Sequence, residues 1–147
     1  MLYLWVFGDN VEDAMGSFRF LIFYLLCGVI ASLTHISTET NSLLPMIGAS
    51  GAISGVLGAY LLLYPRAKVV TLIIFFYFIR IIKLPALVVL SFWIVFQLLS
   101  GTLSLSVEAS YGGVAWFAHI GGFFAGVFLI PIFKKKKIRL GLFHLRK

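Results

Sequence analysis

Four apolar segments constrain the fold of this chain more than any other feature. They cover residues 18–36, 50–64, 86–103 and 116–133. A helix needs about 20 apolar residues to cross about 30 Å of hydrocarbon, because each residue rises about 1.5 Å. Pro65, Pro85 and Pro131 lie at or near segment ends, where proline is tolerated. The pattern predicts an all-α fold, a polytopic transmembrane helical bundle.

The composition requires lipid as the solvent for much of this surface. Hydrophobic residues make up 61% of the chain and charged residues 12%, against about 25% charged in soluble domains. Seven of the 12 Lys and Arg residues lie in residues 134–147, so the positive charge is a run at one end. We therefore expect the lipid bilayer as a partner and no nucleic acid. The single cysteine, Cys27, is expected to be a small buried core residue.

Two further apolar pieces are too short to span a membrane. Residues 1–7 cover only about 10 Å as a helix and resemble the end of a span whose beginning is absent. Residues 69–82 contain Arg80, and Lys83 follows them. The charge-free part, 69–79, would rise only about 16 Å as a helix. It is predicted to be an interfacial or re-entrant helix.

The basic residues predict the orientation of the chain. If residues 69–82 stay on the inner surface, every Lys and Arg lies on the cytoplasmic side, as the positive-inside rule requires. If that segment crossed, the basic tail would lie outside. We therefore expect a transmembrane domain at 1–133 and a cytoplasmic tail at 134–147. The protein is predicted to be a multi-pass protein of a prokaryotic inner (plasma) membrane.

The segment 50–64 is unusual because it is short. Its 15 residues rise about 22 Å, roughly 8 Å less than a full crossing. Arg66 and Lys68 fix its inner end near the membrane surface, so its outer end, with Ser50, should lie below the outer surface. Non-helical backbone at that depth needs protein or water around it. We expect the loop 43–49 to dip inward and Ser50 to lie on the floor of a wet pocket.

Ser50 is a candidate nucleophile. At a helix N-terminus the first backbone N–H groups have no partner within the helix, and the positive end of the helix dipole lies behind them. Such donors could stabilise an oxyanion. Gly48 and Gly51, on either side of Ser50, are candidates for oxyanion or structural support. The alternative is that Ser50 is only an N-cap, a role that serine performs well.

His119 is the candidate general base. It lies four residues into the last apolar segment, on the same side of the membrane and at a similar depth as Ser50. An ionisable residue inside a membrane segment is a functional candidate, and histidine accepts protons near neutral pH. The alternative is a structural histidine at a helix interface.

Glycine spacing predicts that the helices with Ser50 and His119 touch. Small residues four apart let membrane helices approach backbone to backbone. On the last helix, two glycines follow His119 at i+3 and i+7. The predicted packing residues are Gly51, Gly55 and Gly58 on the short helix, and Gly122 and Gly126 on the last. The contact would place His119 near the Ser50 hydroxyl.

Three stretches of the chain resemble parts of rhomboid intramembrane serine proteases. Residues 48–60 resemble the nucleophile helix, and residues 118–122 resemble the histidine helix. Residues 5–16 resemble the turn between the second and third helices. The resemblance covers nearly the whole chain in the right order. It implies an endopeptidase in which Ser50 attacks the peptide bond and His119 is the base, without metal or cofactor. The substrates would be transmembrane proteins. Residues 86–103 would form the lateral gate, and the loop 104–115 the cap.

The chain also departs from the rhomboid pattern. Alignment of residues 5–16 with that pattern implies that the first helix and the start of the second would be absent, and that the family's His-x-x-x-Asn motif would end just before Met1. Met1 would then be either a miscalled start or the start of a natural truncation. Some members also have an aromatic residue one turn after the nucleophile, where this chain has Ser54.

Two other functions remain open. A catalytically impaired rhomboid-like scaffold or substrate-binding protein would have the same fold. A channel or transporter would need polar residues along a path through the membrane, whereas the polar groups here stop at one depth. The oligomeric state stays open. His35, His144, Trp5, Trp93 and Trp116 are predicted to be interfacial, solvated or packing residues.

Overall fold

The computed structural model describes residues 1–38, 48–75, 78–104 and 115–135. In this part of the chain there are five helices and one β-hairpin. The elements are α1 (Leu2–Met15), α2 (Ser17–Thr38), α3 (Ser50–Leu63), β1 (Lys68–Phe75), β2 (Phe78–Pro85), α4 (Ala86–Ser104) and α5 (Trp116–Phe133). The helical fold is confirmed, and each of the four predicted spans is a helix. By length and composition, α2, α4 and α5 can cross a membrane, and α3 is shorter.

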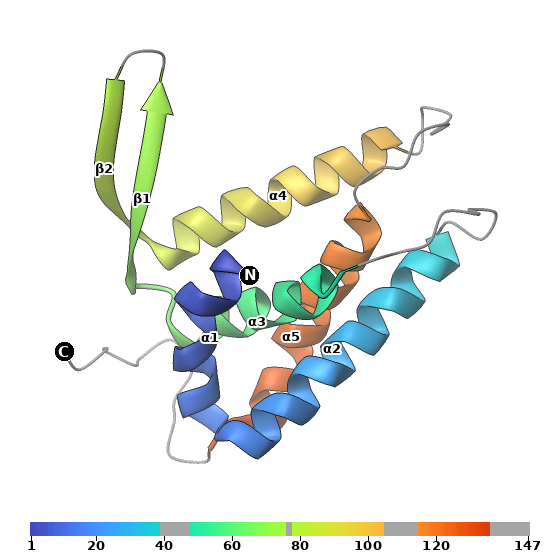
Figure 1. The fold of residues 1–147 in the computed structure, drawn as a ribbon. Helices are drawn as coiled ribbons and strands as arrows, with labels where there is room; N and C mark the ends of the chain where they lie inside the picture. Colours follow the sequence, from blue (N-terminus) through green and yellow to red (C-terminus); the bar gives the residue numbers. More distant parts are fainter. Residues whose placement is uncertain (39–47, 76–77, 105–114, 136–147) are drawn as a thin grey trace.

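The helix α3 lies at the centre of the bundle, with α1, α2 and α5 around it (Figure 1). Most of its residues are buried by the neighbouring helices. A helix that is apolar on every side is stable only where other elements surround it. The 14 residues of α3 are therefore held at membrane depth by protein rather than by lipid.

The helices α3 and α5 approach so closely that side chains would not fit between them. A Cβ added to Gly126 would overlap the carbonyl oxygen of Gly55, and one added to Gly58 would overlap that of Phe123. On the side of α3 that faces α2, a Cβ on Gly55 would lie 2.5 Å from the Cβ of Cys27. Cys27 is buried there, as expected. Glycine at these positions permits backbone contact, which provides much of the packing between membrane helices.

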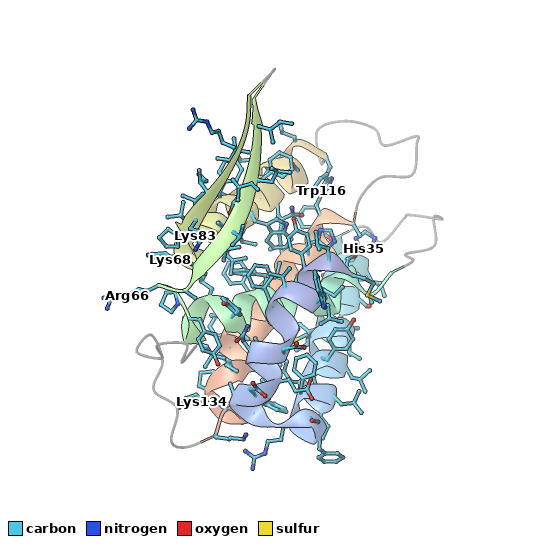
Figure 2. All side chains as sticks on the ribbon, turned by 60° about the vertical axis from the view of Figure 1, so that its left-hand side comes forward. His35, Arg66, Lys68, Lys83, Trp116 and Lys134 are labelled. Atoms are coloured by element: carbon cyan, nitrogen blue, oxygen red, sulfur yellow. The ribbon has the colours of Figure 1, made fainter. Side chains whose placement is uncertain are left out.

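Polar contacts join the ends of α1, α3 and α5 at one end of the bundle. The hydroxyl of Tyr64 donates to the carbonyl oxygen of Asn10 at 2.9 Å. The backbone N–H of Lys135 donates to the carbonyl of Ala14 at 2.9 Å. Figure 2 shows Lys134 at this end and Trp116 at the other. The start of α5 therefore lies at the opposite end of the bundle from the basic residues that follow it.

The turn predicted over residues 5–16 is much shorter in the structure, because residues 5–15 belong to α1. Phe7, Val11 and Met15 are all buried and recur at helical spacing on one face of α1. The polar side chains in this stretch lie on its other faces. The chain turns instead at Gly16, whose φ of 90° is a conformation that favours glycine.

The predicted helix at 69–82 is also wrong, because this segment forms the antiparallel hairpin β1–β2. Lys68 pairs with Pro85 at the base, and Phe75 pairs with Phe78 at the far end. The segment is rich in valine and isoleucine, whose branched side chains favour strands. The hairpin projects away from the helices (Figure 1), and Lys68 and Lys83 lie at its base, close to Arg66 (Figure 2). Open strand edges are not stable in hydrocarbon, which agrees with the prediction that this segment does not span the membrane.

Some predictions concern residues that the structure does not describe. These are residues 43–47 of the inward-dipping loop predicted at 43–49, residues 105–114 of the cap predicted at 104–115, and residues 136–147 of the basic tail predicted at 134–147. They remain predictions.

The glycine contacts predict that Gly126→Ala destabilises the bundle. The added methyl group would overlap the carbonyl of Gly55 on α3, so the helices must separate, at a cost of roughly 1–3 kcal/mol. Thermal unfolding in detergent would measure this loss. Gly101→Ala is the control, since its methyl group would meet no backbone atom: it would lie 3.3 Å from the flexible end of Ile120 and at ordinary contact distance from Trp116 and Phe117. Equal stability of the two variants would contradict backbone contact between α3 and α5.

Candidate active site

Ser50 is the first residue of α3, and its side chain is exposed. The N-cap residue is Ala49, which makes no side-chain capping bond. The alternative that Ser50 serves as the N-cap is therefore wrong. The hydroxyl of Ser50 is available at the helix N-terminus for another purpose.

Gly48 sets the turn that leads into α3. Its φ of 129° lies in a region that residues with a side chain rarely adopt. A Cβ added there would lie 3.8 Å from the Oγ of Ser50. Gly48 therefore acts through backbone conformation, which determines how the chain enters the helix just before the hydroxyl.

The start of α3 presents backbone donors next to Ser50. The first hydrogen bond of the helix runs from the N–H of Ile53 to the carbonyl of Ala49, at 3.0 Å. The N–H groups of Ser50, Gly51 and Ala52 precede this ladder, and the positive end of the helix dipole lies at the same place. A developing oxyanion beside Ser50 would meet hydrogen-bond donors there.

The N-terminus of α3 touches the first turns of α5. A Cβ added to Gly51 would lie 3.4 Å from the carbonyl oxygen of Ala118, and one added to Gly122 would overlap the carbonyl of Gly51. Ser50 directly precedes Gly51 on α3, and His119 directly follows Ala118 on α5. Both residues therefore lie next to this contact between the two helices. Within the described residues, no hydrogen bond joins their side chains.

The imidazole of His119 is held mainly by α4. Its Nδ1 lies 2.8 Å from the Oε1 of Gln97. The ring of Trp93 lies 6.0 Å away between centroids, and that of Trp116 is perpendicular at 6.5 Å. The ring is half-buried. These contacts hold the imidazole between α4 and the first turn of α5.

Ser54 and Gln97 are the two buried polar side chains in the part of the chain that is described. The hydroxyl of Ser54 donates to the carbonyl oxygen of Ser50 at 2.8 Å, and Gln97 contacts His119. Each buried polar group therefore bonds to one of the two candidate catalytic residues. Ser54 does not contact the histidine ring as an aromatic residue would, and the indoles of Trp93 and Trp116 lie beside the ring instead.

Sequence reasoning missed three residues of this site: Gln97, Trp93 and Trp116. Gln97 is an amide in the middle of an apolar span, which is itself a signal, because polar groups at membrane depth need partners. Trp93 precedes Gln97 by four residues and Trp116 precedes His119 by three, so each pair shares a helix face. This spacing could have placed both tryptophans near the histidine.

The other candidates lie outside this cluster. Gly55, Gly58 and Gly126 pack deeper along the contact between α3 and α5. His35 lies near the C-terminal end of α2, at the same end of the bundle as Trp116 (Figure 2). No group of His, Cys, Asp or Glu that could hold a metal occurs among the described residues.

The fold and the site define a class of protein: a polytopic membrane protein with an exposed serine at the N-terminus of a buried helix and a histidine on the helix packed against it. The Rhomboid domain family matches residues 1–136. The chain belongs to the rhomboid family.

Three relatives can be compared with this chain. Rhomboid protein 1, mitochondrial, of Saccharomyces cerevisiae is 30% identical over 86% of this chain and 34% of its own length. Presenilin-associated rhomboid-like protein A, mitochondrial, of Danio rerio is 30% identical over 98% of the chain and 37% of its own length. Rhomboid protease GluP of Bacillus subtilis is 48% identical over 41% of the chain and 11% of its own length. The chain thus spans about a third of the length of the first two. No solved structure matches.

The conformation of Gly48 predicts that Gly48→Ala is destabilising. An alanine at a φ of 129° is strained, and such strain costs about 1–3 kcal/mol. Thermal unfolding in detergent measures the change, with Gly101→Ala as control because Gly101 lies within α4 and its φ is not positive. A Gly48→Ala variant as stable as the control would show that this turn does not require glycine.

Proposed function

We propose that the chain carries the catalytic core of an intramembrane serine endopeptidase, which hydrolyses peptide bonds of transmembrane proteins. Ser50 is the nucleophile and His119 is the general base. The observation that supports the proposal is the contact of Gly51 with Ala118 and Gly122, because these residues flank Ser50 and His119 on the two helices.

Other observations support this assignment. Membership of the rhomboid family gives the class of protein, and one relative is named a rhomboid protease. The free backbone donors at the start of α3 suit an oxyanion. The polar groups gather at one depth near one end of α5, as hydrolysis at a single site requires, rather than along a path for transport.

The proposed reaction has two half-reactions. The Oγ of Ser50 attacks the scissile carbonyl while Nε2 of His119 takes its proton, and the N–H groups of α3 stabilise the oxyanion. The C–N bond then breaks, and His119 gives its proton to the leaving amine, which leaves an acyl ester on Ser50. Water, deprotonated by His119, hydrolyses the ester and restores the hydroxyl. Catalytic hydrogen bonds are often long or absent without substrate, so the lack of a Ser50–His119 bond is compatible with this chemistry.

A rhomboid-like scaffold that binds transmembrane proteins without cleaving them is the second candidate. The observation in its favour is that no hydrogen bond joins the side chains of Ser50 and His119 within the described ranges. The two functions differ in one measurable respect, since a scaffold binds substrates but leaves them intact.

Replacing Ser50 by Ala should abolish cleavage of a transmembrane substrate by the protein in proteoliposomes. Loss of the nucleophile removes the covalent route, so the rate should fall by at least roughly 1000-fold, to background. His119→Ala should have a comparable effect, because residues of one catalytic unit are not additive. Cleavage would be followed by gel analysis of the two products.

The matched control is Ser32→Ala, which removes the hydroxyl of a serine on α2 that bonds the carbonyl of Gly28. Its cleavage rate should stay within about twofold of that of the unmodified protein. Ser50→Ala activity equal to this control would disprove the mechanism. An unmodified protein that binds the substrate but does not cleave it would favour the scaffold.

We also propose that the start of α5 lies on the extracytoplasmic side, in a prokaryotic inner membrane, because the basic residues that directly follow α5 begin at the other end of the bundle. Two of the relatives are named mitochondrial, so the compartment itself needs a test. In a Cys27→Ala background, Ser37→Cys should react in intact bacteria with a maleimide that cannot cross membranes. Lys135→Cys should react only after lysis, and the reverse pattern would contradict the orientation.

A further inference from the structure

Gln97 is an amide in the middle of an apolar, membrane-spanning helix. It is only 4% exposed, and its neighbours on α4, residues 92–96 and 98–99, are all aliphatic or aromatic. A buried amide must find partners, because hydrocarbon offers none. The partner of its Oε1 is the Nδ1 of His119 on α5, 2.8 Å away.

This contact decides which nitrogen of His119 can act as the base. An amide oxygen only accepts hydrogen bonds, so the nitrogen beside it must carry the proton. With the proton on Nδ1, the lone pair of the neutral ring is on Nε2. The opposite assignment, an amide N–H donating to Nδ1, would leave the proton on Nε2, and that nitrogen could not accept the proton of a serine.

The contact also fixes the rotation of the ring. The indoles of Trp93 and Trp116 lie 6.0 and 6.5 Å from the imidazole between ring centroids, with interplanar angles of 39° and 90°. Apolar contacts of this kind limit tilt but do not distinguish one ring nitrogen from the other. Only the bond to Gln97 does so among the contacts of His119 in the described residues.

We propose that Gln97 is the positioning residue of the catalytic pair: it holds His119 in the Nδ1–H tautomer with Nε2 as the base. This inference rests on the proposed function. In serine proteases with a triad, a carboxylate performs this task and also stabilises the imidazolium. Here a neutral amide orients the ring, and it avoids the cost of a charge inside the membrane.

Kinetics of the protein in proteoliposomes test the role in catalysis. Gln97→Met should lower kcat by roughly 10- to 100-fold, a part of the 10²–10⁴-fold that a general base contributes. KM should stay within about twofold, since Gln97 is proposed to contact the base rather than the substrate. Gln97→Glu should restore much of kcat, because a carboxyl oxygen can also accept from Nδ1–H. Leu99→Met, at an exposed position two residues away on α4, is the control.

Nitrogen NMR of the protein labelled with ring-¹⁵N histidine reads the tautomer without any turnover. The signals of His119 are those lost in His119→Asn. In the unmodified protein Nδ1 should show the shift of a protonated nitrogen and Nε2 that of an unprotonated one. Gln97→Met should move the population toward the Nε2–H form.

Two results would overturn the inference. One is an Nε2–H tautomer of His119 in the unmodified protein. This measurement does not require the Gln97→Met variant to fold. The other is a folded Gln97→Met variant with the kcat of the Leu99→Met control. Failure of the proposed function gives a different result, because the unmodified protein would then not cleave at all, whatever its tautomer.

Discussion

The close backbone contact between α3 and α5 is the constraint on which the rest of the structure depends. Lipid tails are as apolar as the side chains, so burial from water cannot drive these helices together within the bilayer. Glycine at Gly51, Gly122 and Gly126 lets the backbones meet, and packing of many atoms replaces the hydrophobic effect. The same contact places the N-terminus of a short buried helix, with its unpaired donors, beside His119. Fold and candidate chemistry therefore depend on the same glycines.

The helices could be predicted from the sequence where the membrane sets their length. The four apolar segments match α2–α5 closely, and glycine spacing predicted which helices touch. The two errors, at residues 69–82 and 5–16, concern segments that were not predicted to span the membrane, so the bilayer thickness does not set their length. Residues 69–82 are a run of apolar, branched residues that can form either a helix or a strand, and only pairing along the chain made it a hairpin. In α1, the resemblance to rhomboid proteases suggested a turn over residues 5–16, although Phe7, Val11 and Met15 already showed helical spacing.

The candidate site could be predicted only in part. Ser50 and His119 are conspicuous because a lone serine at a helix start and a lone histidine in an apolar run each need an explanation. Gln97 and Trp93 lie on α4, whose rotation about its axis no sequence pattern fixed, since nearly all its faces are apolar. Only the packing of α4 against α5 shows that the face with Gln97 meets His119. A polar residue in a span is therefore informative even when its partner is unknown.

The two buried polar side chains of the described residues explain how such a site can exist inside a membrane. Ser54 bonds the carbonyl of Ser50, and Gln97 bonds His119, so each is satisfied by the site itself. Both are neutral, and a neutral group loses far less than an ion when it leaves water. A carboxylate in the place of Gln97 would need its own counter-charge, which no neighbour of His119 in the described structure supplies. A neutral amide at Gln97 therefore suits a site that lies in hydrocarbon better than a carboxylate would.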